Sequence, residues 1–208
     1  MLLDADDSIL ILVDYQARLM PAMADADATI KNATRLAQAA RELSVPVWAT
    51  EQNPAKLGDT LPELACLCDQ RIAKMSFSAE AVLSPLLEQQ SPKPAAAAAQ
   101  SQGGNARSLP KHLRRAPPPA EPERGALVLA GCETHVCLMQ TALELTAREW
   151  DVWVVTDACG SRTERNRDAA YDRMAAAGCE LLTTEMVLFE WLRTAQHPRF
   201  KAIQALIK

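Results

Sequence analysis

The sequence lacks a long apolar stretch, an excess of positive charge and paired cysteines. No segment reaches the roughly 18 apolar residues that a membrane helix needs, and residues 1–7 lack the positive charges of a signal peptide. A net charge of -4, with both signs interspersed, leaves no basic stripe for nucleic acid phosphates. The six cysteines lack the spacing of a zinc site or a secreted disulfide framework. We expect a cytoplasmic protein with free thiols that acts on a small molecule, with no membrane or nucleic acid partner.

Apolar residues are plentiful, at 49% of 208 positions, which is enough to bury one core in a single domain over 1–208. Residues 8–13 read SILILV, a branched apolar run that suits a strand buried on both faces and that ends at Asp14. Residues 27–43 carry apolar side chains at helical spacing, and residues 45–50 return to strand character. A strand, helix and strand of this length predict parallel pairing.

The second half of the sequence repeats this alternation. Three strands with two helices between them are predicted at 125–131, 134–149, 152–156, 165–177 and 180–183, and a further short strand at 71–74. The pattern predicts an α/β fold in which helices cover an open, mostly parallel sheet. In such sheets, sites form outside the carboxyl ends of strands near a switch in strand order. Asp14, Lys74 and the segment after Gly131 lie at such ends.

Residues 91–124 interrupt the regular plan. They are rich in proline, alanine, serine and glycine and poor in branched apolar residues, so they cannot bury enough surface to order themselves. We interpret them as a flexible surface insertion. The alternative is a basic docking tract around residues 111–115.

Three residues at the predicted strand ends are candidates for chemistry. Cys137 falls in the first turn of a helix, where orphan N–H groups and the helix dipole are expected to lower the pKa of the thiol. A thiolate nucleophile also needs a cation and a proton carrier, for which Lys74 and Asp14 are candidates. Each has a structural alternative: Cys137 as a small buried apolar residue, Lys74 as a solvated edge residue, and Asp14 as a turn cap.

Four separated motifs show a resemblance to the isochorismatase-like cysteine hydrolases. They are LVDYQ at 12–16, TEQNP at 50–54 followed by Gly58, RIAKMSFSA at 71–79, and GCETHVCLMQTALEL at 131–145. The C-terminal stretch from residue 157 onward resembles the isochorismatase domain-containing branch of that family. The resemblance covers nearly the whole chain apart from the insertion.

The resemblance implies a three-layer α/β/α fold with a doubly wound, six-stranded parallel sheet and a catalytic triad. The triad positions match Asp14, Lys74 and Cys137. In the family, the cysteine attacks an amide-type carbonyl, the aspartate carries the proton, the lysine holds the charge, and water hydrolyses a thioester intermediate. The resemblance also implies a homo-oligomer, a dimer or a tetramer, and no cofactor.

The family has a cis peptide bond just before the nucleophile helix, which here would join Cys132 to Glu133. This arrangement would aim the backbone amides of Glu133 and Cys137 at an oxyanion, and we carry them over as the hypothesised oxyanion hole. Gln52 and Asn53 follow the second strand and could bind a substrate carbonyl or amide, although an Asn-Pro pair also starts turns for backbone reasons alone.

The sequence departs from two branches of the superfamily. In nicotinamidases of this superfamily, one Asp and two His hold a metal. In this sequence, His112, His135 and His197 form no such set. We therefore predict no metal site. Enzymes that hydrolyse isochorismate generally lack the nucleophilic cysteine, so Cys137 argues against that substrate.

Two alternatives to a thiol hydrolase are open. The chain could be a catalytically silent scaffold that keeps the fold, although a silent protein has no need of all three triad residues. Cys137 could instead be a redox sensor, because an exposed thiol of low pKa oxidises readily.

Overall fold

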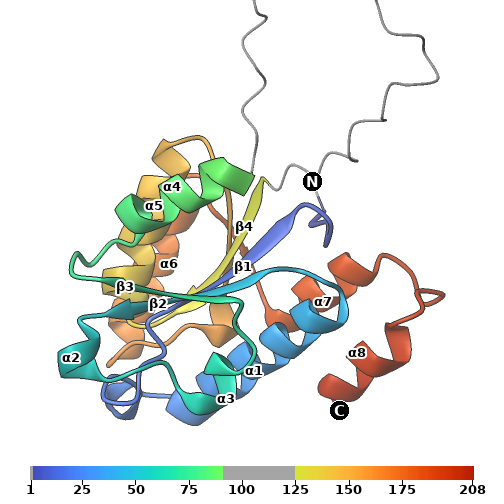
Figure 1. Ribbon diagram of the computed structural model, residues 1–208, viewed down its shortest axis with the longest axis horizontal. Helices are drawn as coiled ribbons and strands as arrows, with labels where there is room; N and C mark the ends of the chain where they lie inside the picture. The colour runs from blue at the N-terminus through green and yellow to red at the C-terminus, as the bar shows by residue number, and fades with distance from the viewer. Residues whose placement is uncertain (1, 91–124) are drawn as a thin grey trace, which may run out of the picture.

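A six-stranded parallel sheet organises the computed structural model, which describes residues 2–90 and 125–208 (Figure 1). The strand order is β3-β2-β1-β4-β5-β6. The strands are β1 (Ser8–Val13), β2 (Val47–Gln52), β3 (Gln70–Lys74), β4 (Ala126–Gly131), β5 (Asp151–Val155) and β6 (Glu180–Leu182). The doubly wound six-stranded sheet expected from the sequence is confirmed.

Strand β1 lies in the middle of the sheet, between β2 and β4, and its side chains pack against both faces. All six of its residues are buried. Leu10 and Leu12 pack into the apolar cluster on one face, and Ile9, Ile11 and Val13 pack into the cluster on the other. An uninterrupted apolar run is what a strand covered on both faces requires.

Helices cover the two faces and complete three layers. One face carries α1 (Ala26–Glu42), α7 (Thr184–Leu192) and α8 (Phe200–Leu206), and the other carries α4 (Glu80–Gln90), α5 (Met139–Ala147) and α6 (Glu164–Ala176) (Figure 1). Short helical segments at the sheet edges are η1 (Met20–Ala22), α2 (Pro54–Leu57), α3 (Pro62–Ala65), a π-helical turn η3 (Thr134–Leu138) and η4 (Thr156–Ala158). The three-layer α/β/α arrangement is therefore confirmed.

The strand order reverses between β1 and β4. From β1 the chain proceeds outward through β2 and β3, then returns to β4 and proceeds the other way through β5 and β6. Gly131 ends β4 so close to β1 that an added Cβ would lie 2.6 Å from the Cβ of Val13 and closer still to its carbonyl oxygen. Only glycine allows this approach, which brings the segment after β4 beside Asp14.

The insertion expected at 91–124, with its basic tract, lies outside the described residues. Among the residues that the structure does describe, no helix combines the length and the apolar character needed to cross a bilayer.

Candidate active site

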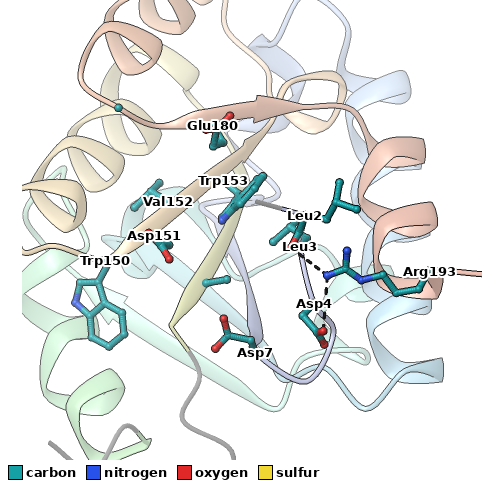
Figure 2. Close-up of a pocket in the computed structure, with 12 residues that line it drawn as sticks. Leu2, Leu3, Asp4, Asp7, Trp150, Asp151, Val152, Trp153, Glu180 and Arg193 are labelled. Atoms are coloured by element: carbon teal, nitrogen blue, oxygen red, sulfur yellow. Dashed lines mark hydrogen bonds and ion pairs between the residues drawn. The ribbon is translucent and has the colours of Figure 1, made fainter.

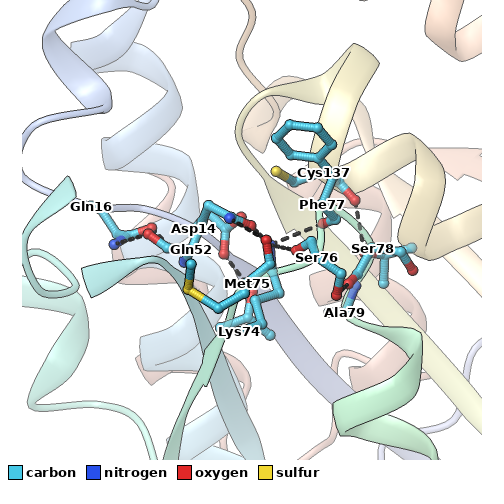
Figure 3. A network of polar contacts seen from close by, with 12 residues as sticks. Asp14, Gln16, Gln52, Lys74, Met75, Ser76, Phe77, Ser78, Ala79 and Cys137 are labelled. Carbon is cyan, nitrogen blue, oxygen red and sulfur yellow. Dashed lines mark hydrogen bonds and ion pairs between the residues drawn. The ribbon is translucent and has the colours of Figure 1, made fainter. Parts of the chain in front are cut away.

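The carboxyl ends of three strands bring Asp14, Lys74 and Cys137 together. Asp14 follows β1, Lys74 ends β3, and Cys137 lies in the π-helical turn that follows β4. The Lys74 ammonium contacts the Asp14 carboxylate at 2.7 Å between Nζ and Oδ2, and both side chains are fully buried (Figure 3). The charges of both groups also act on the Cys137 thiol, with Asp14 raising its pKa and Lys74 lowering it. The structure thus makes one cluster of the three residues singled out in the sequence.

The backbone of Asp14 adopts a strained conformation. Its φ angle of 56° lies in the left-handed region, which residues with a Cβ seldom adopt. The carboxylate is held from a second side, because the Thr50 hydroxyl donates to Oδ1 at 2.8 Å. Strain of this kind costs about 1–3 kcal/mol and concentrates at functional sites.

Thr50 was missed in the sequence. Parallel pairing sets Val13 opposite Thr50, and the Asp14 N–H donates to the Thr50 carbonyl. The signal that could have identified Thr50 was its position in the TEQNP motif on the strand next to Asp14. That signal becomes usable only when the register of the two strands is known.

The Lys74 ammonium is saturated by acceptors within the protein. Besides Asp14, it donates to Gln52 Oε1 at 2.9 Å, to the Phe77 carbonyl at 2.9 Å and toward the Ser76 carbonyl at 3.3 Å. An ammonium carries three N–H donors, so four surrounding acceptors leave none for a ligand. Lys74 is therefore buried within the site, and the alternative of a solvated edge lysine is wrong.

The Cys137 thiol has a raised pKa, which corrects the expectation from the sequence. Burial, as the largest cause, together with the charge of Asp14 raises the pKa of this thiol to about 12, and the opposing Lys74 charge lowers it only in part. The expectation of a lowered pKa relied on the helix N-terminus alone. It was wrong because tertiary packing removes water from the thiol and sets a carboxylate beside it.

The peptide bond between Cys132 and Glu133 is cis, as the family resemblance implied. The Glu133 carboxylate accepts from Arg162 Nε at 2.7 Å, which ties the segment before Cys137 to the loop after β5. The use of the Glu133 and Cys137 amides as an oxyanion hole stays a prediction.

Gln52 joins Lys74 to the loop after β3. While its Oε1 accepts from Lys74, its Nε2 donates to the Met75 carbonyl at 2.8 Å. Asn53 has a left-handed φ of 40°, and its N–H donates to the Lys74 carbonyl at 2.8 Å. Both residues thus fix the backbone or the ammonium of Lys74. Their contact with a substrate stays a prediction.

No metal ligand set forms within residues 2–90 and 125–208, where no three His, Cys, Asp or Glu side chains cluster suitably. The prediction that the protein needs neither metal nor cofactor is untested by this observation.

A separate pocket of about 600 Å³ opens at the other end of the sheet, where β4, β5 and β6 begin (Figure 2). It is lined by Trp150, Trp153, Asp151 and Glu180 among others, and Arg193 on its wall is paired with Asp4. Its lining contains no thiol, hydroxyl, imidazole or amine that could act as a nucleophile. The cluster around Cys137 is therefore the better candidate for an active site.

Comparison with known proteins identifies relatives over nearly the whole chain. The Isochorismatase domain family model matches residues 8–186. Isochorismatase domain-containing protein 2 of Xenopus laevis is 36% identical over 200 residues, which cover 96% of this chain and 83% of that protein.

Three solved structures share this fold over nearly the whole chain. The MAR1 ribonuclease of Caenorhabditis elegans matches with a TM-score of 0.79 and 28% identity, over 100% of this chain and 92% of that one. The YcaC gene product of Escherichia coli, an octameric hydrolase of unknown specificity, matches with a TM-score of 0.79 and 25% identity. The match covers 100% of this chain and 89% of that one. YcaC from Pseudomonas aeruginosa, solved with hexane-2,5-diol and covalent acrylamide, matches with a TM-score of 0.77 and 25% identity. The match covers 99% of this chain and 91% of that one.

Proposed function

The chain belongs to the isochorismatase family of hydrolases, and from this premise we propose that it cleaves a small amide or related carbonyl compound through Cys137. The observation that carries the proposal is the buried Asp14–Lys74 ion pair, whose two charges act on the buried Cys137 thiol. A nucleophile beside a proton acceptor, which is itself held by a third group, is the arrangement that covalent catalysis requires.

Acylation begins with the transfer of the Cys137 proton to the Asp14 carboxylate. The sulfur attacks the substrate carbonyl carbon, and a C–S bond forms while the C=O electron pair moves to oxygen. The amides of Glu133 and Cys137 stabilise this oxyanion. When the carbonyl re-forms, the C–N bond breaks and Asp14 returns the proton to the departing nitrogen, leaving a thioester on Cys137.

Deacylation uses the same carboxylate. Asp14 takes a proton from a water molecule, whose oxygen attacks the thioester carbon, and the C–S bond breaks as the carbonyl re-forms. The sulfur recovers the proton, and the carboxylic acid product leaves. Throughout the cycle, the Lys74 ammonium stabilises whichever of Asp14 and Cys137 carries the negative charge.

The raised pKa of Cys137 supports this division of roles. A thiol with a pKa of about 12 carries its proton in the resting enzyme, so attack on the substrate needs an adjacent base. Asp14 occupies that position. The covalent acrylamide of P. aeruginosa YcaC adds support, because acrylamide is a small electrophile that bonds to nucleophiles.

We also propose that the protein is a homo-oligomer. The E. coli YcaC gene product is octameric, which favours self-association and extends the range beyond the dimer or tetramer expected from the sequence. Localisation in the cytoplasm stays a prediction.

Replacement of the nucleophile tests the proposal. Cys137→Ser should abolish release of ammonia or amine from a panel of small amides, and Cys66→Ser, at an exposed cysteine, should leave it intact. Intact-mass analysis of the wild type should show a substrate-derived acyl adduct that is absent in Cys137→Ser. Undiminished turnover in Cys137→Ser would refute the proposal, and reversible oxidation without any hydrolysis would favour the redox sensor.

We expect no cleavage of RNA, although the C. elegans relative is a ribonuclease. The N–H groups of Lys74 all donate to acceptors inside the protein, so none is available for a phosphate. RNA cleavage that disappears in Cys137→Ser would overturn this expectation.

A further inference from the structure

The loop after β3 turns its backbone inward and its large side chains outward. The Met75 carbonyl accepts from Gln52, and the Phe77 carbonyl accepts from Lys74. The side chains of the same two residues lie largely in solvent, with Met75 72% exposed and Phe77 56% exposed. The loop that holds the Lys74 ammonium therefore carries two large, exposed apolar side chains.

The loop that carries these side chains is tied to the segment that carries the thiol. Two hydrogen bonds link this loop to the Cys137 helix: the Ala79 N–H donates to Thr141 Oγ1 at 2.9 Å, and that hydroxyl donates to the Cys137 carbonyl at 2.7 Å. Figure 3 shows Phe77 and Cys137 on the same side of the Asp14–Lys74 pair. We call Met75 and Phe77 the apolar rim.

The charges around the thiol disfavour an anionic substrate. Lys74 is fully buried with its donors engaged, and Asp14 beside it is negative. Arg162, the cation next to the Cys132–Glu133 bond, is already paired with Glu133 at 2.7 Å. Each of these two cations is matched by a carboxylate, so the two ion pairs contribute no net positive charge that would attract a substrate carboxylate.

We propose that the site selects uncharged carbonyl compounds with an alkyl or aryl group that packs on the apolar rim. This inference rests on the proposed function and names its substrate class. Contact with such a group removes apolar surface of Met75 and Phe77 from water, which is favourable in proportion to the area covered.

Alkylation of Cys137 tests the selectivity without knowledge of the natural substrate. With iodoacetamide, the thiol first loses its proton to solvent, and the thiolate then attacks: an S–C bond forms, the C–I bond breaks and iodide leaves. Iodoacetate reacts in the same way but carries a negative charge. Rates at Cys137, mapped by peptide mass spectrometry and divided by those of free glutathione, should favour iodoacetamide by at least about tenfold, because iodoacetate must bring an unpaired charge to a buried thiol.

Chain length provides the second comparison. In a series from iodoacetamide to its N-ethyl and N-butyl derivatives, each added methylene that reaches the rim should raise the normalised rate by about two- to fourfold. The double variant Met75→Ser/Phe77→Ser should lose this dependence. The matched control Met186→Ser/Phe189→Ser removes the same two residue types, also exposed, from α7 on the other face, and should keep it.

The outcomes separate this inference from the proposed function. If no reagent reacts at Cys137, the nucleophile itself is refuted and the inference with it. If Cys137 reacts but iodoacetate matches iodoacetamide, or the rim variant keeps the chain-length dependence, the selectivity alone is overturned. A rim variant with unchanged selectivity and a smaller oligomeric mass would assign the rim to a subunit interface instead.

Discussion

Replacing Asp14 with asparagine separates the two effects of its carboxylate on Cys137. The charge of Asp14 and its hydrogen bond both raise the pKa of the thiol, which stands at about 12. Asparagine keeps the shape and removes the charge, so the pKa of Cys137 should fall. The Lys74 ammonium, no longer opposed, lowers it further.

The size of the effect follows from the charge that is removed. A neighbouring charge within about 4–6 Å shifts a pKa by about 1–3 units, so the thiolate fraction near neutral pH should rise about ten- to a thousandfold. Nucleophilicity falls as the pKa falls, with a Brønsted coefficient of about 0.4–0.5, so the alkylation rate should rise by about three- to thirtyfold.

The assay compares alkylation and hydrolysis on the same samples. Iodoacetamide modification of Cys137, followed across pH, should climb in the wild type as pH approaches the raised pKa, and at lower pH in Asp14→Asn. Amide hydrolysis should be lost in Asp14→Asn, because no group is left to carry the proton. The exposed Asp59, replaced in Asp59→Asn, provides a control that should change neither rate.

One pair of results would refute this reasoning. If Asp14→Asn reacts with iodoacetamide no faster than the wild type and still hydrolyses amides, Asp14 neither raises the thiol pKa nor carries its proton. Circular dichroism and the thermal midpoint establish that the variant is folded under the assay conditions.

Two further substitutions test what holds the site in place. Lys74→Met leaves the Asp14 carboxylate buried without its counter-charge, so it should lower the unfolding free energy by about 3–5 kcal/mol and raise the pKa of Cys137 further. Urea unfolding should show a change within about 0.5 kcal/mol for the exposed Lys31→Met control, and equal stability of the two variants would contradict the ion pair. Gly131→Ala forces a Cβ against Val13 and should cost about 3 kcal/mol or more. For Gly125→Ala, where the nearest atom lies 3.6 Å away, we expect a change within about 1 kcal/mol, and similar losses in both would argue against the close approach of β1 and β4.

The sequence alone predicted the strands and helices well because their signals are local. The SILILV run of β1 requires two covered faces, and the alternation of strands with helices requires parallel crossovers. The strand ends at Asp14 and Lys74, and the turn that holds Cys137, followed from the same patterns. Their joint role came from the family resemblance, since spacing alone also allowed a turn cap, an edge lysine and a small core residue.

Only the tertiary structure decided the electrostatic state of the site. The pKa of Cys137 depends on how much water surrounds the sulfur and on the balance between Asp14 and Lys74, which are far apart in the chain. Likewise, saturation of Lys74 and the exposure of the apolar rim depend on where a few backbone carbonyls point. Periodicity and composition report which residues are buried, whereas charge interactions depend on distances across the sheet, and those exist only once the strands have paired.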